Sequence, residues 1–289
     1  MEPILEDLIH LLALERIDTN LFRGESRDIG TSRVFGGQVL GQALAAANYT
    51  TEGREVHSLH AYFLRQGDHT APIVYEVDRQ RDGRSFSSRR VVAIQHGRPI
   101  LNLAASFQVP EEGLEHSAPM PQVTAPDELK DIREYRKEFI ATIPVEDLPR
   151  PFLLEHPFEF RPVEPPRFGD VEAAPATQHV WFRAVGELPD DDDLHRNMLA
   201  YLSDYYLLLT ALRPHALTAF SPNLQVASLD HALWFHRPFR IDRWMLYAME
   251  SSNASGARGL SHGRIYCRDG TLVANVAQEG VTRLWESAE

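Results

Sequence analysis

The chain has 289 residues, 43% of them hydrophobic and 24% charged, and its formal net charge at pH 7 is −12. This length suits one large domain or two domains of ordinary size, and the composition is typical of a soluble globular protein. The acidic balance argues against broad binding of nucleic acid or of anionic membranes, although it leaves room for a local basic pocket. We therefore expect no nucleic-acid partner.

The N-terminal segment predicts a surface helix and not a targeting sequence. Its apolar residues recur at helical spacing and are Ile4, Leu5, Leu8, Leu11 and Leu12. The segment lacks the basic region and the small-residue cleavage site of a signal peptide, and no stretch of the chain is long enough to span a membrane. Cys267 is the single cysteine, so no internal disulfide can form. We expect a structural thiol and a cytoplasmic protein.

The chain has the pattern of a duplication. In the first half, a helix rich in small residues is predicted over Gly36–Ala47 and is followed by strand-like segments at 57–65, 72–80, 85–95 and 99–108. In the second half, a helix is predicted over Asn197–Leu212 and is followed by segments at 225–236, 244–252, 258–267 and 272–280. Because the order of elements is the same, we predict an α+β fold of two repeats, each with a central helix on an antiparallel sheet.

A proline-rich stretch separates the two repeats. Residues 110–175 hold 12 of the 19 prolines, a density that breaks regular structure and favours an extended connection. Within this stretch, residues 127–140 have helical spacing and charges of both signs, which predicts a short exposed helix. We therefore divide the chain into an N-terminal repeat at 1–110, a connecting segment at 111–176 and a C-terminal repeat at 177–289.

Asp204 is the only formally charged residue between Arg196 and Arg213, in a run that is otherwise largely apolar. Burying a carboxylate there is costly unless it is hydrogen-bonded or paired. Such a group is a candidate for catalysis, because its surroundings can tune its protonation. The alternative is a structural carboxylate that caps a neighbouring turn.

Several well-known kinds of active site are missing from the sequence. There is no Gly-x-Ser-x-Gly elbow, no Walker loop and no dinucleotide-binding glycine fingerprint. There is no His-Glu-x-x-His motif and no paired cysteine, and the histidine pairs His57/His60 and His231/His236 lack a third ligand at a recognisable spacing. We therefore expect neither a metal nor a cofactor.

Strings spread in order along nearly the whole chain resemble one family. The first half contains FGGQVLGQALAAA (Phe35–Ala47), HSLHAYFLRQGD (His57–Asp68) and RDGRSFSSRRVVAIQHGRPI (Arg81–Ile100). The second half contains LAYLSD (Leu199–Asp204), SLDHALWFHRPF (Ser228–Phe239) and VANVAQEGVTR (Val273–Arg283). Together they resemble acyl-CoA thioesterase II. The resemblance implies a double hotdog fold, in which the two repeats form one continuous sheet, and the hydrolysis of acyl-CoA to CoA and a fatty acid.

The resemblance also implies three catalytic residues in the C-terminal repeat. The acid of the family falls on Asp204, its hydroxyl residue on Ser228 and its amide on Gln278. Many relatives carry threonine where this chain has Ser228, and serine keeps the hydroxyl but has a freer rotamer. These residue types suit a thioester, because a carboxylate can take the proton of a water that a hydroxyl and an amide help to orient.

Other residues are weaker candidates for substrate binding. Gly36 and Gly37 could free backbone N–H groups for a ligand, or they could let the helix pack closely on its sheet. His57 lies on the strand that corresponds to the Ser228 strand, so it could line a pocket between the repeats. The clustered arginines of residues 79–98 and 258–268 could meet CoA phosphates or form a solvated face.

Two other functions stay open at this point. One is a hotdog hydratase or dehydratase of enoyl thioesters, which would need a His–Asp pair that the Asp204 helix does not offer. The other is a non-catalytic acyl-CoA-binding protein. A serine nucleophile is disfavoured because His231, three residues from Ser228, would point to the opposite face of a regular strand. We also expect a homo-oligomer, as is common among soluble enzymes.

Overall fold

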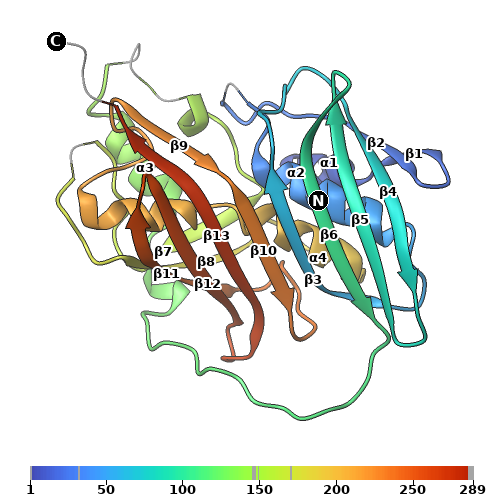
Figure 1. Ribbon diagram of the computed structural model, residues 1–289. Helices are drawn as coiled ribbons and strands as arrows, with labels where there is room; N and C mark the ends of the chain where they lie inside the picture. Colours follow the sequence, from blue (N-terminus) through green and yellow to red (C-terminus); the bar gives the residue numbers. More distant parts are fainter. Residues whose placement is uncertain (1, 32, 145–147, 149, 170, 286–289) are drawn as a thin grey trace.

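The structure is a computed structural model and describes residues 2–31, 33–144, 148, 150–169 and 171–285. In this part of the chain, thirteen strands form one antiparallel sheet in the order β1-β2-β4-β5-β6-β3-β10-β13-β12-β11-β8-β7, with β9 pairing to β13 (Figure 1). The first half supplies β1 (Glu15–Asp18), β2 (Leu21–Gly24), β3 (Glu55–Phe63), β4 (Ile73–Asp82), β5 (Phe86–Gln95) and β6 (Arg98–Gln108). The connecting segment supplies β7 (Phe158–Pro162), and the second half supplies β8 (Thr177–Ala184), β9 (Leu224–Ser228), β10 (Asp230–Phe235), β11 (Met245–Ser255), β12 (Arg258–Cys267) and β13 (Leu272–Leu284).

The two halves meet in the middle of the sheet, where β3 pairs with β10. In this antiparallel pair, Leu59 lies opposite Leu233 and Ala61 opposite His231. The strands of both halves therefore form one continuous sheet, as predicted. The predicted sequence segments missed β1, β2, β7 and β8, which are the two outermost strands at each end of the sheet.

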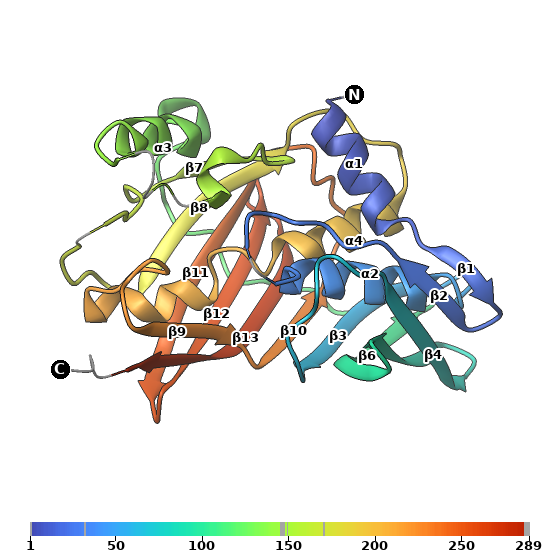
Figure 2. The same ribbon diagram turned by 90° about the horizontal axis from the view of Figure 1, so that it is seen from above.

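The central helices α2 (Gly36–Asn48) and α4 (Asp192–Leu202) lie side by side on one face of the sheet (Figure 2). Their close approach depends on glycine. A Cβ atom at Gly37 would lie 2.1 Å from the backbone oxygen of Tyr201, and one at Gly41 would lie 2.9 Å from that of Asn197. Close packing on the sheet was one of the two interpretations of Gly37, whereas Gly37 and Gly41 both face the backbone of α4. The N-terminal helix α1 (Pro3–Leu12) packs its leucines into the same core, as predicted.

The predicted helix over Asn197–Leu212 is wrong beyond Leu202. Helix α4 ends there, and a 3-10 helix begins at Leu208 and runs to His215. Between them, the Leu207 N–H donates to the Tyr205 oxygen at 2.8 Å, and the central residue Tyr206 has a φ of 67°. A three-residue turn with positive φ at a tyrosine is strained. Helical periodicity did not reveal the break because the leucines on both sides of it stay buried.

The predicted strand over 225–236 is also interrupted. It divides at Leu229 into β9, which pairs with β13, and β10, which pairs with both β3 and β13. Leu229 itself bridges the two halves, because its oxygen accepts from the Phe63 N–H at 2.9 Å while its own N–H donates to Glu279 at 2.9 Å. The interruption changes the direction of side chains on the two sides of Leu229.

The connecting segment is more ordered than proline content alone predicted. It contains 3-10 helices at Pro126–Glu128 and Arg150–Leu153, helix α3 (Ile132–Ile140) and strand β7. The predicted helix over 127–140 begins later, because Asp131 forms a capping box with Glu134. The early part of the segment crosses the second-half strands and packs on them, where the Trp181 Nε1 donates to the Thr124 oxygen at 2.9 Å.

Candidate active site

Three polar side chains from distant parts of the second half meet at one point. The Gln278 Nε2 donates to the Asp204 Oδ1 at 2.6 Å and lies 3.0 Å from the Ser228 Oγ. The Ser228 Oγ in turn donates to the Asp204 Oδ1 at 3.5 Å, a long contact. The structure therefore brings the three predicted residues together in one hydrogen-bonded cluster.

The breaks in regular structure position this cluster. Asp204 lies two residues beyond the end of α4, directly before the strained turn, and Ser228 is the last residue of β9. Gln278 comes from β13, close to Gly280, which lies opposite Ser228 in the antiparallel pair. An uninterrupted helix would carry Asp204 on as part of its regular surface, so the turn after Leu202 is what aims the carboxylate at the strands.

The Asp204 carboxylate is enclosed, with only 6% of its side chain exposed. Burial raises its pKa, and hydrogen bonds from Gln278, the backbone amide of Gly37 and Ser228 partly offset that rise. Gly37 belongs to the first turn of α2, where N–H groups have no partner within the helix and the helix dipole favours negative charge. The first half of the chain therefore contributes a helix N-terminus to a site whose side chains come from the second half.

The predicted substrate residues Gly36 and Gly37 have separate positions. A Cβ atom at Gly36 would lie 2.7 Å from the Asp204 Oδ2, so a larger residue would displace the carboxylate. Gly36 lines the main pocket, whereas Gly37 reaches Asp204 through its amide and packs against α4. The Asp204 carboxylate therefore occupies the space that a side chain at position 36 would need.

His231 is a neighbour of Asp204 that the sequence analysis placed on the wrong side. Its Nδ1 lies 4.0 Å from the Asp204 Oδ1, and its Nε2 lies 2.8 Å from the Ser203 Oγ. Because the Ser203 hydroxyl donates to the Ala200 oxygen, the ring nitrogen is the donor to Ser203. Burial lowers the pKa of His231 to about 3, so the ring is neutral. The expectation assumed a regular strand, and the interruption at Leu229 removes that assumption.

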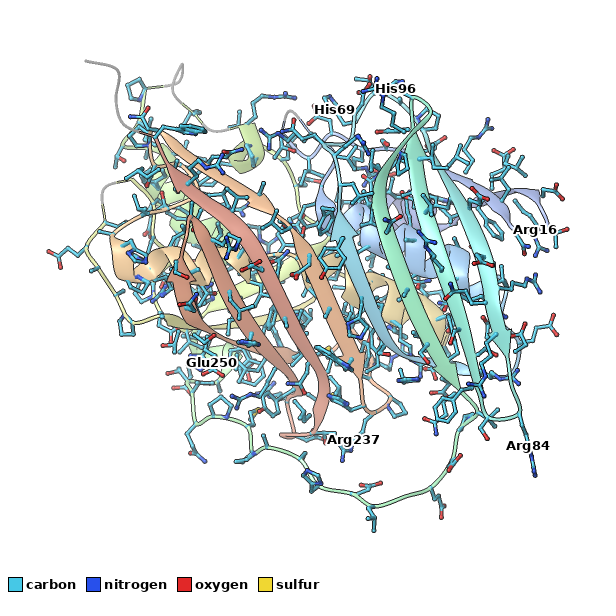
Figure 3. All side chains as sticks on the ribbon, in the orientation of Figure 1. Arg16, His69, Arg84, His96, Arg237 and Glu250 are labelled. Atoms are coloured by element: carbon cyan, nitrogen blue, oxygen red, sulfur yellow. The ribbon has the colours of Figure 1, made fainter. Side chains whose placement is uncertain are left out.

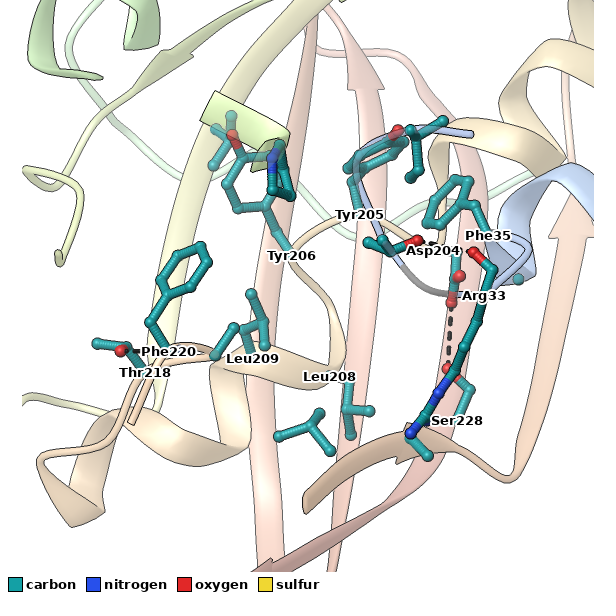
Figure 4. A pocket seen from close by; sticks show the side chains of 18 of the residues that line it. Arg33, Phe35, Asp204, Tyr205, Tyr206, Leu208, Leu209, Thr218, Phe220 and Ser228 are labelled. Atoms are coloured by element: carbon teal, nitrogen blue, oxygen red, sulfur yellow. Dashed lines mark hydrogen bonds between the residues drawn. The ribbon is translucent and has the colours of Figure 1, made fainter. Parts of the chain in front are cut away.

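A pocket of about 760 Å³ opens beside the cluster (Figure 4). Asp204, Ser228 and Gly36 line it, whereas the Gln278 side chain is fully buried behind them. Residues of both repeats and of the connecting segment form the rest of the wall, which is mostly apolar. A cleft of this size and character is typical of a site for a ligand with a long apolar part.

Other sequence candidates lie away from this pocket. His57 lies on β3 with its Nε2 2.8 Å from the Ser106 Oγ and its ring against Phe86, and it is not part of the pocket wall. The clustered arginines of residues 79–98 and 258–268 do not line the pocket either. Arg84, for example, extends from the turn between β4 and β5, beyond the ends of these strands (Figure 3). The pocket instead contains arginines that the sequence analysis did not single out, namely Arg33, Arg65, Arg136, Arg167 and Arg213.

Two remaining features concern the rest of the chain. Burial raises the pKa of Cys267 to about 11, so its thiol stays protonated at neutral pH. Among the described residues, no helix is both long and apolar enough to cross a membrane.

Comparison with known proteins identifies the family of this architecture. A family model described as acyl-CoA thioesterase matches residues 148–281, and one described as acyl-CoA thioesterase N-terminal domain matches residues 23–108. Acyl-CoA thioesterase 2 of Haemophilus influenzae is 47% identical over 287 residues, which cover 99% of this chain and 100% of that relative. Human acyl-coenzyme A thioesterase 8 is 43% identical over 282 residues, covering 95% of this chain and 88% of the human protein.

Solved structures agree on the fold. The crystal structure of an acyl-CoA thioesterase II, TesB2, from Mycobacterium marinum matches with a TM-score of 0.79 and 41% identity, covering 96% of this chain and 99% of that one. A hot dog fold protein of unknown function from Alicyclobacillus acidocaldarius has a TM-score of 0.77 at 20% identity, covers 97% of this chain and 99% of that one, and so supports the fold alone. The predicted double hotdog is confirmed, and the chain belongs to the acyl-CoA thioesterase family.

Proposed function

We propose that this chain hydrolyses acyl-CoA thioesters by direct attack of a water molecule that Asp204, Ser228 and Gln278 hold and orient. The observation that carries the proposal is the hydrogen-bonded cluster of these side chains at the wall of a largely apolar pocket. An acyl chain can occupy such a pocket while its thioester carbonyl lies against the polar cluster.

Asp204 is the base in this proposal. Its carboxylate takes a proton from the water, whose oxygen forms a bond to the thioester carbon. The tetrahedral intermediate then breaks its carbon–sulfur bond, and the proton held by Asp204 passes to the departing sulfur. Because burial raises the pKa of Asp204, the carboxylate is a better proton acceptor than an exposed aspartate.

Gln278 and Ser228 fix the direction of the base. Gln278 is fully buried, so its amide is suited to holding the carboxylate and the Ser228 hydroxyl from behind. Ser228 lines the pocket and can contact the water directly. Such positioning removes orientational freedom before the reaction and can lower the barrier by several kcal/mol.

The N-terminus of α2 is suited to stabilise the charge that develops on the carbonyl oxygen. Gly36 is the first residue of α2 and lines the pocket next to Asp204. The N–H groups of a first helical turn have no partner within the helix, and the helix dipole adds positive potential there. A preorganised donor of this kind is the usual means of stabilising an oxyanion.

The main alternatives receive less support from the same geometry. A hydratase needs a histidine that reaches the substrate together with the catalytic aspartate. His231 is buried and does not line the pocket, and His179, which does line it, is bonded to Glu164 and not to Asp204. A serine nucleophile needs a close base, whereas the contact between Ser228 and Asp204 is 3.5 Å long. A non-catalytic acyl-CoA-binding protein would have no need for a buried carboxylate next to a strained turn.

The test is the release of free thiol from medium-chain and long-chain acyl-CoA by the wild type and by Asp204→Asn. We expect the wild type to release thiol and the variant to be slower by a factor of about 10² to 10⁴, the range for a lost general base. Absence of release by the wild type would refute the thioesterase, and full activity of the variant would refute the role of Asp204. An acyl-enzyme adduct found by mass spectrometry during turnover would contradict direct attack by water.

A further inference from the structure

The imidazole of His231 is a buried group beside the catalytic cluster to which the proposed reaction gives no role. It lies on β10, opposite Ala61 of the first repeat, and is 1% exposed. Its ring spans two consecutive residues after the end of α4, because its Nε2 lies 2.8 Å from the Ser203 Oγ and its Nδ1 lies 4.0 Å from the Asp204 Oδ1. Since His231 does not line the pocket, it meets the catalytic carboxylate from behind the pocket wall.

Hydrogen bonds at Ser203 fix which ring nitrogen of His231 carries the proton. The Ser203 hydroxyl donates its single hydrogen to the Ala200 oxygen at 3.0 Å, so it can only accept from the His231 Nε2. The backbone of Ser203 is held as well, because the Tyr247 hydroxyl donates to its oxygen at 2.9 Å. A neutral imidazole has one donor and one acceptor. The Nδ1 atom of His231 therefore carries a lone pair.

This lone pair faces a carboxylate and not a donor. Among the described residues, the His231 Nδ1 is a buried atom without a hydrogen-bond partner, and such an atom is costly. The Asp204 Oδ1 that it faces has only lone pairs of its own while the carboxylate is ionised. A proton on Asp204 would supply the missing donor. The arrangement therefore favours the protonated form of Asp204.

The hydrogen-bonding neighbours of Asp204 act in the opposite sense. The Gln278 Nε2 donates to the Asp204 Oδ1 at 2.6 Å, and the Ser228 hydroxyl and the Gly37 amide also donate to the carboxylate. Each of these groups stabilises the ionised form. His231 is the neighbour that offers an acceptor to the protonated form.

The titratable groups around Asp204 are otherwise neutral at neutral pH. The phenols that interact with its charge are Tyr201, Tyr205 and Tyr247, and burial raises the pKa of each. In the part of the chain that the structure describes, no lysine or arginine nitrogen lies within the 4.0 Å that separates His231 from the carboxylate. Arg33 is the charged residue that appears with Asp204 on the pocket wall in Figure 4.

Building on the proposed hydrolysis, in which Asp204 is the base, we propose that His231 is a positioning residue that accepts a hydrogen bond from the Asp204 carboxyl while it holds the proton of the attacking water. One O–H bond of the water breaks, its proton bonds to the carboxylate, and its oxygen bonds to the thioester carbon. The O–H on Oδ1 then turns to Nδ1 as the gap closes to about 3 Å. The proton stays on Asp204 until it passes to the sulfur. A contact made only with the protonated base stabilises the transition state over the ground state.

The experiment separates the two ring nitrogens with two amide variants. His231→Gln places its amide near the position of Nε2 and can keep the bond to Ser203, but it removes Nδ1. His231→Asn places an amide oxygen near Nδ1, where it can accept from Asp204, but it loses the bond to Ser203. The pH profiles of kcat/KM and kcat for octanoyl-CoA are measured from about pH 4 to pH 9 with a dithiodipyridine reagent for free thiol.

Activity requires the ionised base, so it rises as the pH passes through the pKa of Asp204. Loss of an acceptor for the protonated form lowers this pKa. We expect His231→Gln to shift the acid limb of kcat/KM by about half a unit to one unit towards lower pH and to reduce kcat about three- to tenfold. His231→Asn should stay close to the wild type. An unchanged limb, a shift to higher pH, or equal shifts in both variants would overturn the proposal.

Two further variants control for a merely structural role. His195 is also 1% exposed, but its Nδ1 accepts from the Ile241 amide at 3.3 Å, so His195→Gln should lower thermal stability without moving the acid limb. An equal shift in His195→Gln would refute the proposal. Ser203→Ala keeps His231 and removes the acceptor of its Nε2 proton. The proton can then move to Nδ1 and donate to ionised Asp204, so the limb should again shift to lower pH. An unchanged limb in Ser203→Ala would contradict the proposal even if the His231 variants fail to fold.

Nitrogen NMR of protein with isotope-labelled histidine tests the inference without turnover. The signals of His231 are those that His231→Gln lacks. We expect an unprotonated Nδ1 at neutral pH, with a resonance that moves as Asp204 becomes protonated in the wild type but not in Asp204→Asn. If the wild type hydrolyses no acyl-CoA, the proposed function fails, and this resonance still decides whether Nδ1 accepts from Asp204. A protonated Nδ1, or a resonance that ignores Asp204, would refute the inference even in an active enzyme.

Discussion

The two repeats share an architecture but end their central helices differently. In the first half, Thr50 follows the end of α2, and its Oγ1 donates to Ala47 and accepts from the Arg89 Nε at 2.9 Å. Arg89 is 2% exposed and also binds Asp82 at 2.6 Å, so this helix end is closed by neutralised polar groups. In the second half, the corresponding place beyond α4 holds Asp204, a buried carboxylate next to a pocket.

The strands show the same contrast. Strand β3 runs as one strand from Glu55 to Phe63, with an irregularity in its pairing to β6 between Val56 and Ser58, whereas its counterpart is divided at Leu229 into β9 and β10. The first half therefore keeps this strand undivided and contributes a helix N-terminus and closely packed glycines. The second half gives up regularity at the points where Asp204 and Ser228 are placed. The two repeats have similar architectures, but only the second has its central helix and strand interrupted at the places that hold the polar side chains.

The largest expected effect is a loss of stability at the contact between α2 of the first repeat and α4 of the second. Gly37→Ala would place a Cβ atom 2.1 Å from the backbone oxygen of Tyr201, and backbone cannot move aside as a flexible side chain can. We expect the free energy of unfolding to fall by about 3 kcal/mol, as for other overpacked core positions. Urea denaturation measures the change. Gly113→Ala is the control, because no atom lies within 4 Å of a Cβ built there, and equal stability of the two variants would contradict close packing of α2 on α4.

The next prediction compares matched serines of the two repeats. Ser228 and Ser58 occupy equivalent places in the strings Ser228-Leu229-Asp230 and Ser58-Leu59-His60. We expect Ser228→Ala to lower kcat about tenfold, the factor for one lost hydrogen bond of about 1.5 kcal/mol, and Ser228→Thr to keep most of the activity. Ser58→Ala should leave kcat unchanged, because the first half supplies no side chain to the cluster. Thiol-release assays on the three variants decide, and equal losses in both alanine variants would break the comparison.

Much of this organisation was predictable from the sequence because it depends on repeated patterns. Alternating strands, the small-residue helix and the order of elements indicated two repeats and one sheet. Asp204, Ser228 and Gln278 came from the family resemblance, and the lone charge in an apolar run supported Asp204 independently. The turn at Tyr206 and the interruption at Leu229 could not be predicted, since each is decided by tertiary contacts and leaves the apolar spacing unchanged. The pocket role of the connecting segment was hidden for a similar reason, because Phe152 and Phe168, which line the pocket, are far apart in sequence and their rings meet only in the folded chain.

The smallest expected effect is the stability cost of the buried Asp204 carboxylate in the second repeat. Burial raises the pKa of Asp204, so the folded state prefers the protonated form. The stability that this group contributes is therefore present below its unfolded pKa of about 4 and is lost as the pH rises through the raised folded value. At neutral pH the ionised carboxylate is a cost, and Asp204→Asn should raise the free energy of unfolding by about 1 kcal/mol, as is common when a functional site is neutralised. Thermal unfolding between pH 4 and pH 8 (a range set by the ordinary aspartate pKa) should show this gain shrinking as the pH falls.

Asp242 gives the control with the opposite sign. Burial alone would raise its pKa, but hydrogen bonds from Arg240 and from the Leu188 amide bring the pKa of this carboxyl below its ordinary value. Its stability is present above the unfolded pKa and is lost as the pH falls through the lowered folded value. Asp242→Asn should therefore destabilise the protein at neutral pH, while Asp204→Asn stabilises it. If both variants lower stability at neutral pH, Asp204 is a structural carboxylate, and the second repeat carries no stability cost for its site.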